Sequence, residues 1–422
     1  MDFALLLLLN AVLFIRPTEV VPGLIGLPLY AITLTACLIL GYPSIVRHAT
    51  SAPLSRQPIT ACILGFAACA VASNLARLQV AEAWATCDIF FKIIIYYYLI
   101  VGLVTTIERL DRFLMWSAFG AVLVNAMAIL DFAGHMSFMN MNPFRDIGRM
   151  SASGLFGDPN DMGFLLVQNM LSSLYFATRP EGSPLIRWLW IAPMAFLGYG
   201  LTLTQSRGGL IAFLGGLGTC LAFRYGRRAL PMGVIVLPAV LYAFSGRQAE
   251  FDLGEGSAQS RLHLWDTYWG LFRGNPLLGI GCNNSLQYEH HVAHNSFLGA
   301  FAEVGFPGGA LFLGAFALAL WELWRVRPAR VVHTDRRLGR VLPFLAGSVA
   351  AYVFGMFSLS RAYVIPTYNV LGLTVAYLAL ARTDPPVPRA RLDAKTLWAF
   401  GGLSVAFLIA LRLMLIMKLS YY

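Results

Sequence analysis

Long apolar stretches, separated by short polar connections, are the feature that most restricts how this chain can fold. About thirteen of them approach the roughly 20 residues that a helix needs to cross a bilayer. In lipid every backbone polar group needs an internal partner, so such stretches fold as helices. We predict an all-α integral membrane protein with 12–13 transmembrane helices in one polytopic domain over residues 1–422. The candidate spans are 3–15, 24–42, 57–75, 83–106, 111–132, 162–178, 186–204, 208–223, 229–245, 294–323, 341–360, 367–381 and 396–417.

The composition supports this class. Of the 422 residues 58% are hydrophobic and 12% are charged, against about 25% charged in soluble domains. A soluble enzyme and a disordered chain are therefore excluded. Five of the six cysteines lie within apolar stretches and leave Cys282 alone, so no disulfide framework is expected. Because the apolar first stretch follows Asp2 without a basic segment or a cleavage site, we expect an uncleaved first helix.

The basic residues predict the orientation in the membrane. The net charge is +10, and the arginines punctuate the apolar stretches instead of clustering with aromatic residues, which argues against a nucleic-acid partner. Because Lys and Arg are retained on the cytoplasmic side, we sorted them by connection. Alternate connections hold nineteen, and the connections between them hold nine. This places the N-terminus inside, and the long connections 133–161 and 246–293 outside.

The nine arginines on the outer side are exceptions to the rule that Lys and Arg stay on the cytoplasmic side. Each therefore needs a local interaction that explains its position. Contact with lipid headgroups is the favoured explanation for Arg16, Arg77 and Arg247. For the others an anionic ligand at the outer face is the sharper hypothesis. The nine are Arg16, Arg77, Arg145, Arg149, Arg207, Arg247, Arg261, Arg273 and Arg361.

The outer connection 246–293 carries a predicted helix. Residues 261–273 have helical periodicity, with Leu262, Trp265, Trp269 and Phe272 on one face and Arg261 pointing elsewhere. Such a helix suits the membrane interface, with its aromatic side towards the lipid. The turn signal Gly274-Asn-Pro ends it.

The chain re-enters the membrane at His294. A neutral imidazole at the first turn of a span can accept a proton from a hydroxyl, as a general base requires. The alternative is a histidine that only stabilises the helix start. The glycines at 305, 308 and 309 make one helix face small, which favours close helix packing and a rigidly held histidine.

Two further charged groups have structural alternatives. The carboxylates of Asp158 and Asp161, with acidic residues between 250 and 266, offer ligands for Mg²⁺, but Asp-Pro-Asn-Asp before an apolar run is also typical of a helix N-cap. The loop histidines have no zinc spacing, and we expect no metal and no cofactor. Asp88 and Lys92, four residues apart, predict a structural salt bridge rather than an ion-coupling pair of a transporter.

The motif around His294 resembles the signature of the O-antigen ligase family. His294 and Asn295 are followed by nine residues, then Gly305, two residues, and Gly308 with Gly309. Weaker pieces of the wider ligase and polymerase superfamily occur in matching order: residues 157–161, 204–209, Arg261 with Trp265, and Pro276 followed by two glycines. By motif the resemblance covers roughly residues 145–310.

The resemblance implies a metal-independent, inverting glycosyltransferase with a GT-C-type membrane fold. It implies transfer of O-antigen from undecaprenyl diphosphate to lipid A–core at the periplasmic face of the bacterial inner membrane. His294 is the expected base. Arginine binds phosphate oxygens bidentately, so Arg207 is the first catalytic candidate for the diphosphate. Arg261, Arg361, Arg145 and Asn295 are assigned to substrate binding.

Rival functions stay open at this stage. An O-antigen or exopolysaccharide polymerase shares the chemistry, a protein O-oligosaccharyltransferase comes third, and a non-enzymatic transporter of lipid-linked sugars would not need the histidine motif. The residues do not determine which glycan is transferred, which core sugar accepts it, the oligomeric state, or whether the last apolar stretch crosses the membrane.

Overall fold

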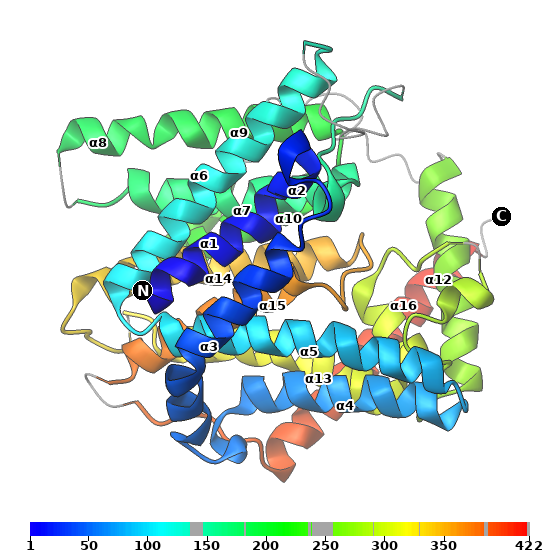
Figure 1. The fold of residues 1–422 in the computed structure, drawn as a ribbon. Helices are drawn as coiled ribbons and strands as arrows, with labels where there is room; N and C mark the ends of the chain where they lie inside the picture. The colour runs from blue at the N-terminus through cyan, green and yellow to red at the C-terminus, as the bar shows by residue number, and fades with distance from the viewer. Residues whose placement is uncertain are drawn as a thin grey trace.

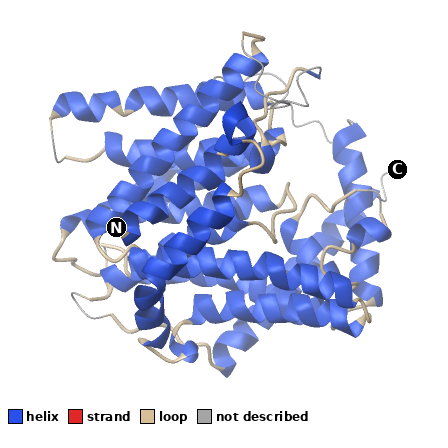
Figure 2. Cartoon of the chain, in the orientation of Figure 1, coloured by secondary structure: helices blue, strands red, loops and turns tan. Residues whose placement is uncertain are grey.

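The chain folds into a bundle of helices, and the computed structural model describes residues 1–135, 147–180, 183–234, 238, 256–289, 291–328, 330–383 and 387–419. Within these ranges the secondary structure is helical, without strands (Figure 2). The helices in the first half are α1 (Asp2–Ile15), α2 (Pro17–Val20), α3 (Leu29–Thr50), α4 (Pro58–Ala76), α5 (Val80–Leu103), α6 (Ile107–Phe132) and α7 (Pro159–Ala177). Those that follow are α8 (Pro184–Leu189), α9 (Ile191–Thr204), α10 (Arg207–Tyr225), α12 (Gly256–Gly274), α13 (Ser296–Arg325), α14 (Arg336–Met356), α15 (Ile365–Ala381) and α16 (Ala394–Leu419).

The predicted class, an all-α integral membrane protein, is confirmed. Ten helical segments in the described part are long and apolar enough to cross a membrane, fewer than the 12–13 predicted. Two further predicted spans are present as helices: α15 has only 17 residues, and the buried helix α7 carries polar side chains along its length. The predicted span 229–245 lies mostly outside the described residues.

The last apolar helix, α16, runs from one face of the bundle to the other. Just before it, the Leu392 amide donates to the Ser55 carbonyl, in the connection between α3 and α4, at 2.7 Å. Towards its far end Arg412 pairs with Asp266 of α12 at 2.7 Å. Helix α12 stands at one end of the bundle, across the direction of α4 and α5 (Figure 1). Helix α16 is also among the helices that are long and apolar enough to cross a membrane.

The predicted helix over 261–273 is confirmed as part of α12, but its aromatic face covers protein. Tyr268 and Phe272 are buried, and with Trp265 and Trp269 they belong to a hydrophobic cluster shared with α13 and α16. The pair Asp88–Lys92 also forms as predicted, at 2.5 Å on an exposed face of α5.

Helix α13 is broken at Gly305. The residue has φ 78° and ψ −178°, and the break lets the connection after α12 dock on the helix backbone. Phe306 donates to the Pro276 carbonyl at 2.7 Å, and Gly281 donates to the Glu303 carbonyl at 3.0 Å. A Cβ at residue 305 would lie 2.3 Å from the Leu277 oxygen.

This corrects the expected role of the glycine motif. Gly305 is needed for backbone conformation and close backbone approach, not for helix packing. Gly308 does face a neighbouring helix, since a Cβ there would lie 3.3 Å from Cys69 of α4. At Gly309 a Cβ would meet the ring of Phe301 in the same helix.

We predict that Gly305→Ala destabilises the protein by about 1–3 kcal/mol, because the new Cβ combines backbone strain with a clash. Thermal unfolding in detergent measures the effect. The matched control is Gly401→Ala in α16, where a Cβ would meet open space, and which should leave the unfolding temperature unchanged or slightly raised. Equal unfolding temperatures for the two variants would contradict this role of Gly305.

Candidate functional site

Three helix N-termini begin beside one another at one face of the bundle, and each has a polar cap. Asp158 caps α7 by accepting from the Asn160 amide at 2.7 Å. Ser206 caps α10 by accepting from Gly209 at 3.0 Å. Asn295 caps α13 by accepting from Phe297 at 3.2 Å and from Leu298 at 3.1 Å. The sequence predicted only the first of these caps, as one of two alternatives.

Hydrogen bonds between the caps hold these helix ends together. The Ser206 hydroxyl donates to the Asn160 side chain at 2.7 Å, which joins α10 to α7. The Ser296 hydroxyl donates to the Leu359 carbonyl at 2.6 Å and accepts from the Arg361 amide at 2.8 Å, which joins α13 to the connection between α14 and α15. Helix N-termini carry partial positive charge, so their convergence favours an anion at this face.

His294 lies directly before the cap of α13 and is half-buried. Its φ of 48° places it in the left-handed region, an unfavourable conformation that tends to occur at functional sites. Burial, and next the positive charge of Arg261, lower the pKa of His294 below the ordinary 6.5; Arg361 adds to this and Asp158 opposes it. The imidazole is therefore neutral at neutral pH, as a general base must be.

Side chains of helix α12 donate hydrogen bonds to the backbone just before His294. Trp265 donates to the Ala293 carbonyl at 2.8 Å, and the Tyr268 hydroxyl donates to the His291 carbonyl at 3.3 Å. Arg261 precedes Trp265 by four residues, so the two share a side of the helix. The expectation that Arg261 points away from the aromatic face is therefore wrong: it lies on the side of Trp265 and acts on the charge of His294.

The other predicted arginines have different surroundings. Arg207 is the first residue of α10 and half-buried. Arg361 is half-buried and forms a two-point ion pair with the buried Asp161 of α7, so its charge is largely compensated and it has a structural partner. Arg145 lies outside the described residues, as does Arg247.

Buried polar atoms without a protein partner also gather at this face. Among the described residues, the His294 Nδ1, the Asn295 Nδ2 and the Ser360 hydroxyl have no hydrogen-bond partner. Buried polar atoms usually have hydrogen-bond partners. A polar ligand bound at this face would provide a partner for each of the three atoms. Asn295 thus holds the helix with its oxygen and leaves its nitrogen available.

The acidic residues considered as metal ligands have protein partners instead. Asp158 is a helix cap, Asp161 pairs with Arg361, and Asp266 pairs with Arg412. Within the described ranges no three His, Cys, Asp or Glu side chains are grouped for a metal ion. Glu250, Asp252 and Glu255 lie outside those ranges.

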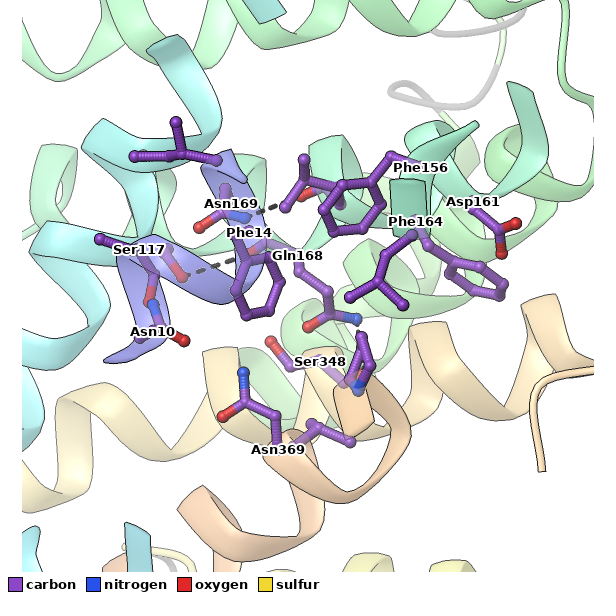
Figure 3. A pocket seen from close by; sticks show the side chains of 18 of the residues that line it. Asn10, Phe14, Ser117, Phe156, Asp161, Phe164, Gln168, Asn169, Ser348 and Asn369 are labelled. Carbon is purple, nitrogen blue, oxygen red and sulfur yellow. Dashed lines mark hydrogen bonds between the residues drawn. The ribbon is translucent and has the colours of Figure 1, made fainter. Parts of the chain in front are cut away.

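A groove of about 460 Å³ extends from this face into the bundle. It lies between α1, α6, α7, α14 and α15, and Asp158, Asp161 and Arg361 line its outer end. Figure 3 shows Asp161 at one end of the groove and Asn10, Ser117 and Asn369 towards the other.

The polar side chains deep in the groove are mostly bonded within the protein. Asn10 donates to Ser117 at 3.1 Å and accepts from Tyr96 at 2.6 Å. Gln168 donates to the Ser348 carbonyl, and Asn169 donates to the Leu165 carbonyl. The other residues that line the groove are largely apolar and include Phe14, Phe113, Leu165 and Leu373.

Sequence reasoning missed several residues of this site. Asn160 was noticed as part of a capping motif and of a superfamily piece but was given no role, and Asp161 was not matched with Arg361, 200 residues away. Arg77 was assigned to lipid headgroups, but it donates to the Gly279 carbonyl at 2.7 Å and holds the connection after α12. Arg16 was assigned likewise and pairs with Glu19. Asp161 and Arg361 are 200 residues apart and Arg77 and Gly279 are 202 apart, so local spacing does not signal these two pairs, whereas Arg16 and Glu19 are three residues apart.

These features define a multi-pass membrane protein with a cationic, partly buried site where several helices begin at one face. Residues 192–313 match the family model described as O-antigen ligase. The match confirms the family resemblance inferred from His294 and the glycines after it, and it includes Arg207, Arg261 and Asn295. Arg361 and the groove lie beyond the matched segment. No curated protein matches the chain.

We predict that the pH dependence of the glycosyl transfer implied by the family match reports the ionisation of His294. Because its pKa is lowered, the imidazole loses its proton-accepting form only as the pH falls below the ordinary 6.5, so the rate should hold at neutral pH and decline on the acidic side. Arg261→Gln removes a charge that lowers this pKa, and the acidic decline should move to higher pH. The measurement is a pH–rate profile of purified protein in vesicles.

Arg273→Gln is the matched control, since it removes an exposed arginine of the same helix that is not among the groups acting on His294. Its profile should follow the wild type. An acidic decline at the same pH in Arg261→Gln and wild type would contradict the electrostatic link between Arg261 and His294.

Proposed function

We propose that this protein is an O-antigen ligase. It transfers O-antigen polysaccharide from undecaprenyl diphosphate to lipid A–core oligosaccharide, at the periplasmic face of the bacterial inner membrane. The observation that carries the proposal is a conformationally strained His294 where capped helix N-termini meet, with its pKa lowered by burial and by the charges of Arg261 and Arg361. The family match over 192–313 supports the class of reaction.

The chemistry follows from these residues. A hydroxyl of the acceptor attacks the anomeric carbon of the donor glycan from the face opposite the diphosphate, and its proton passes to His294. The bond from that carbon to the diphosphate oxygen breaks, and the configuration inverts. Arg207 and Arg261, with the three helix N-termini, stabilise the departing diphosphate.

Arg361 has a different task in this proposal. Because Asp161 compensates its charge, and because its amide bonds to Ser296, it fixes the start of α13 relative to α7. It also lines the mouth of the groove, where it contributes hydrogen-bond donors more than net charge. Asn295 presents its unpartnered nitrogen to the substrate while its oxygen caps the helix.

We propose that the groove binds the lipid chain of the donor. It is apolar along most of its length and opens at the mouth where Arg361 and Asp158 lie. A polyprenyl diphosphate has the same polarity, an apolar chain with an anionic end. We therefore place the first isoprene units between α6, α7 and α15, with the diphosphate towards the helix N-termini. On this proposal the fold is of the GT-C type.

Reconstitution into vesicles with an undecaprenyl-diphosphate glycan, with and without lipid A–core, tests the function. We expect glycan on lipid A–core, at the same rate in excess EDTA. His294→Ala should lower the rate about 10²–10⁴-fold, the usual contribution of a general base. His263→Ala, at an exposed position of α12, should behave as wild type.

The alternatives give different outcomes in the same assay. Growth of the lipid-linked glycan without lipid A–core would replace the ligase by a polymerase, the second member of the superfamily. Transfer at wild-type rate by a folded His294→Ala variant would remove the histidine from the mechanism. Movement of lipid-linked sugar without any glycosidic product would indicate a transporter.

A second experiment tests the groove. Gly120 of α6 lines it and has open space around a Cβ, so Gly120→Leu should fill the groove and raise KM for the lipid-linked donor several-fold. Gly218→Leu in α10, where a Cβ also meets open space outside the groove, should leave KM unchanged. Equal KM values for both variants would show that the donor chain lies elsewhere.

A further inference from the structure

A second cavity lies at the opposite face of the bundle. It measures about 1050 Å³ and is lined by the ends of α7, α10 and α13 and by the start of α14. Four helices lead from it to the site around His294: α7, α10 and α13 begin at that site, and α14 ends beside it. Helices α7 and α10 have 19 residues each, which spans about 28 Å, close to the hydrocarbon thickness of a bilayer.

The walls of this cavity are cationic. Five arginines line it: Arg179, Arg224, Arg227, Arg327 and Arg340. No carboxylate lies among the described residues that line it. Arg179 has its charge compensated by Asp111 at 3.0 Å. For Arg224, Arg227 and Arg327, the part of the chain that the structure describes provides no ion pair.

Aromatic rings hold two of these arginines in position. The guanidinium of Arg327 lies 3.4 Å from the ring centre of Trp324. That of Arg224 lies 5.5 Å from the ring of Tyr225 and 6.0 Å from the ring of Phe344. Arginine on an aromatic face keeps its charge for another partner. The Arg327 Nη1 donates to the Trp324 carbonyl at 3.1 Å, and the other N–H groups of its fork remain for a ligand. These side chains are thus pre-arranged to bind phosphate oxygens bidentately.

Arginines at the cytoplasmic ends of helices are expected, because Lys and Arg are retained on that side of the membrane. That rule does not explain why these arginines surround a cavity or why their guanidinium groups stack on aromatic rings. The arginines here surround a space that holds a phosphate group and its substituents. Its rim includes exposed apolar side chains, with Leu230 76% and Tyr225 40% exposed. A charged pocket with an apolar rim at the depth of the helix ends matches a lipid better than a soluble anion.

We propose that this cavity, between α7, α10, α13 and α14, binds an anionic phospholipid of the cytoplasmic leaflet. The phosphodiester headgroup lies between Arg224, Arg227 and Arg327, and the acyl chains leave over the apolar rim. Basic pockets between helices on this side of a membrane bind such headgroups in general. This site is separate from the proposed transferase site and does not rest on it.

Two double variants test the proposal. Arg224→Gln with Arg327→Gln removes two arginines of the cavity, while Arg330→Gln with Arg391→Gln removes two exposed arginines of the same face outside it. Each purified protein is titrated with phosphatidylglycerol in phosphatidylcholine vesicles, and bound lipid is measured by native mass spectrometry. Near a lipid surface each arginine contributes about fivefold in affinity, so the cavity variant should bind phosphatidylglycerol about twenty-fivefold more weakly than the control variant.

Further arms separate the sources of the phosphate. Phosphatidylcholine should neither bind measurably nor raise the unfolding temperature, and sn-glycerol 3-phosphate should not displace phosphatidylglycerol. Displacement by glycerol phosphate would overturn the lipid in favour of a soluble anion. Equal binding by the two double variants would overturn the site.

If the cavity variant fails to fold, Arg224→Lys with Arg327→Lys replaces it. These residues keep the charge but lose the forked geometry. Weaker binding than wild type supports the site, and unchanged binding shows that net charge alone attracts the lipid and overturns it.

Discussion

The structure depends on three polar caps that allow three helices to begin at one place. Asp158, Ser206 and Asn295 satisfy the first amides of α7, α10 and α13, which belong to turns that are largely buried within the protein. The bonds between Ser206 and Asn160, and between Ser296 and the 357–364 connection, then bring these starts together. The result is a concentration of partial positive charge next to His294, built from backbone as much as from side chains.

Because the helix ends supply partial positive charge, few arginine side chains are needed next to His294. Arg361, which by sequence is one of several equivalent candidates, is compensated by Asp161. Arg77 is used to hold a backbone carbonyl after α12. Arg261 acts on His294 through space, and Arg207 begins a helix whose dipole adds to its charge. In the proposed function the donor diphosphate carries several negative charges, and the partial positive charge of the helix ends shares in balancing them.

Much of this was predictable from the sequence, because the signals are local. The apolar stretches define the helices, and the pairs at spacing four, such as Asp88 and Lys92, follow from one turn of a helix. The motif after His294 predicted the resemblance to the family whose model matches residues 192–313, and it gave the base candidate. Its glycines were recognised, but the role of Gly305 was not, because a packing glycine and a helix break look alike in sequence. Only contact with Leu277 distinguishes them.

The sequence by itself determined the membrane class, the approximate positions of the spans and the division of arginines between two faces, since each follows from composition and spacing along the chain. The tertiary structure alone decided which arginines are compensated, where α16 ends, and that a groove runs from Arg361 between α1, α6 and α15. The physical reason is distance along the chain. An ion pair between residues 161 and 361, or a cavity between five helices, depends on how helices pack, and packing in lipid depends on shape complementarity that no short motif records.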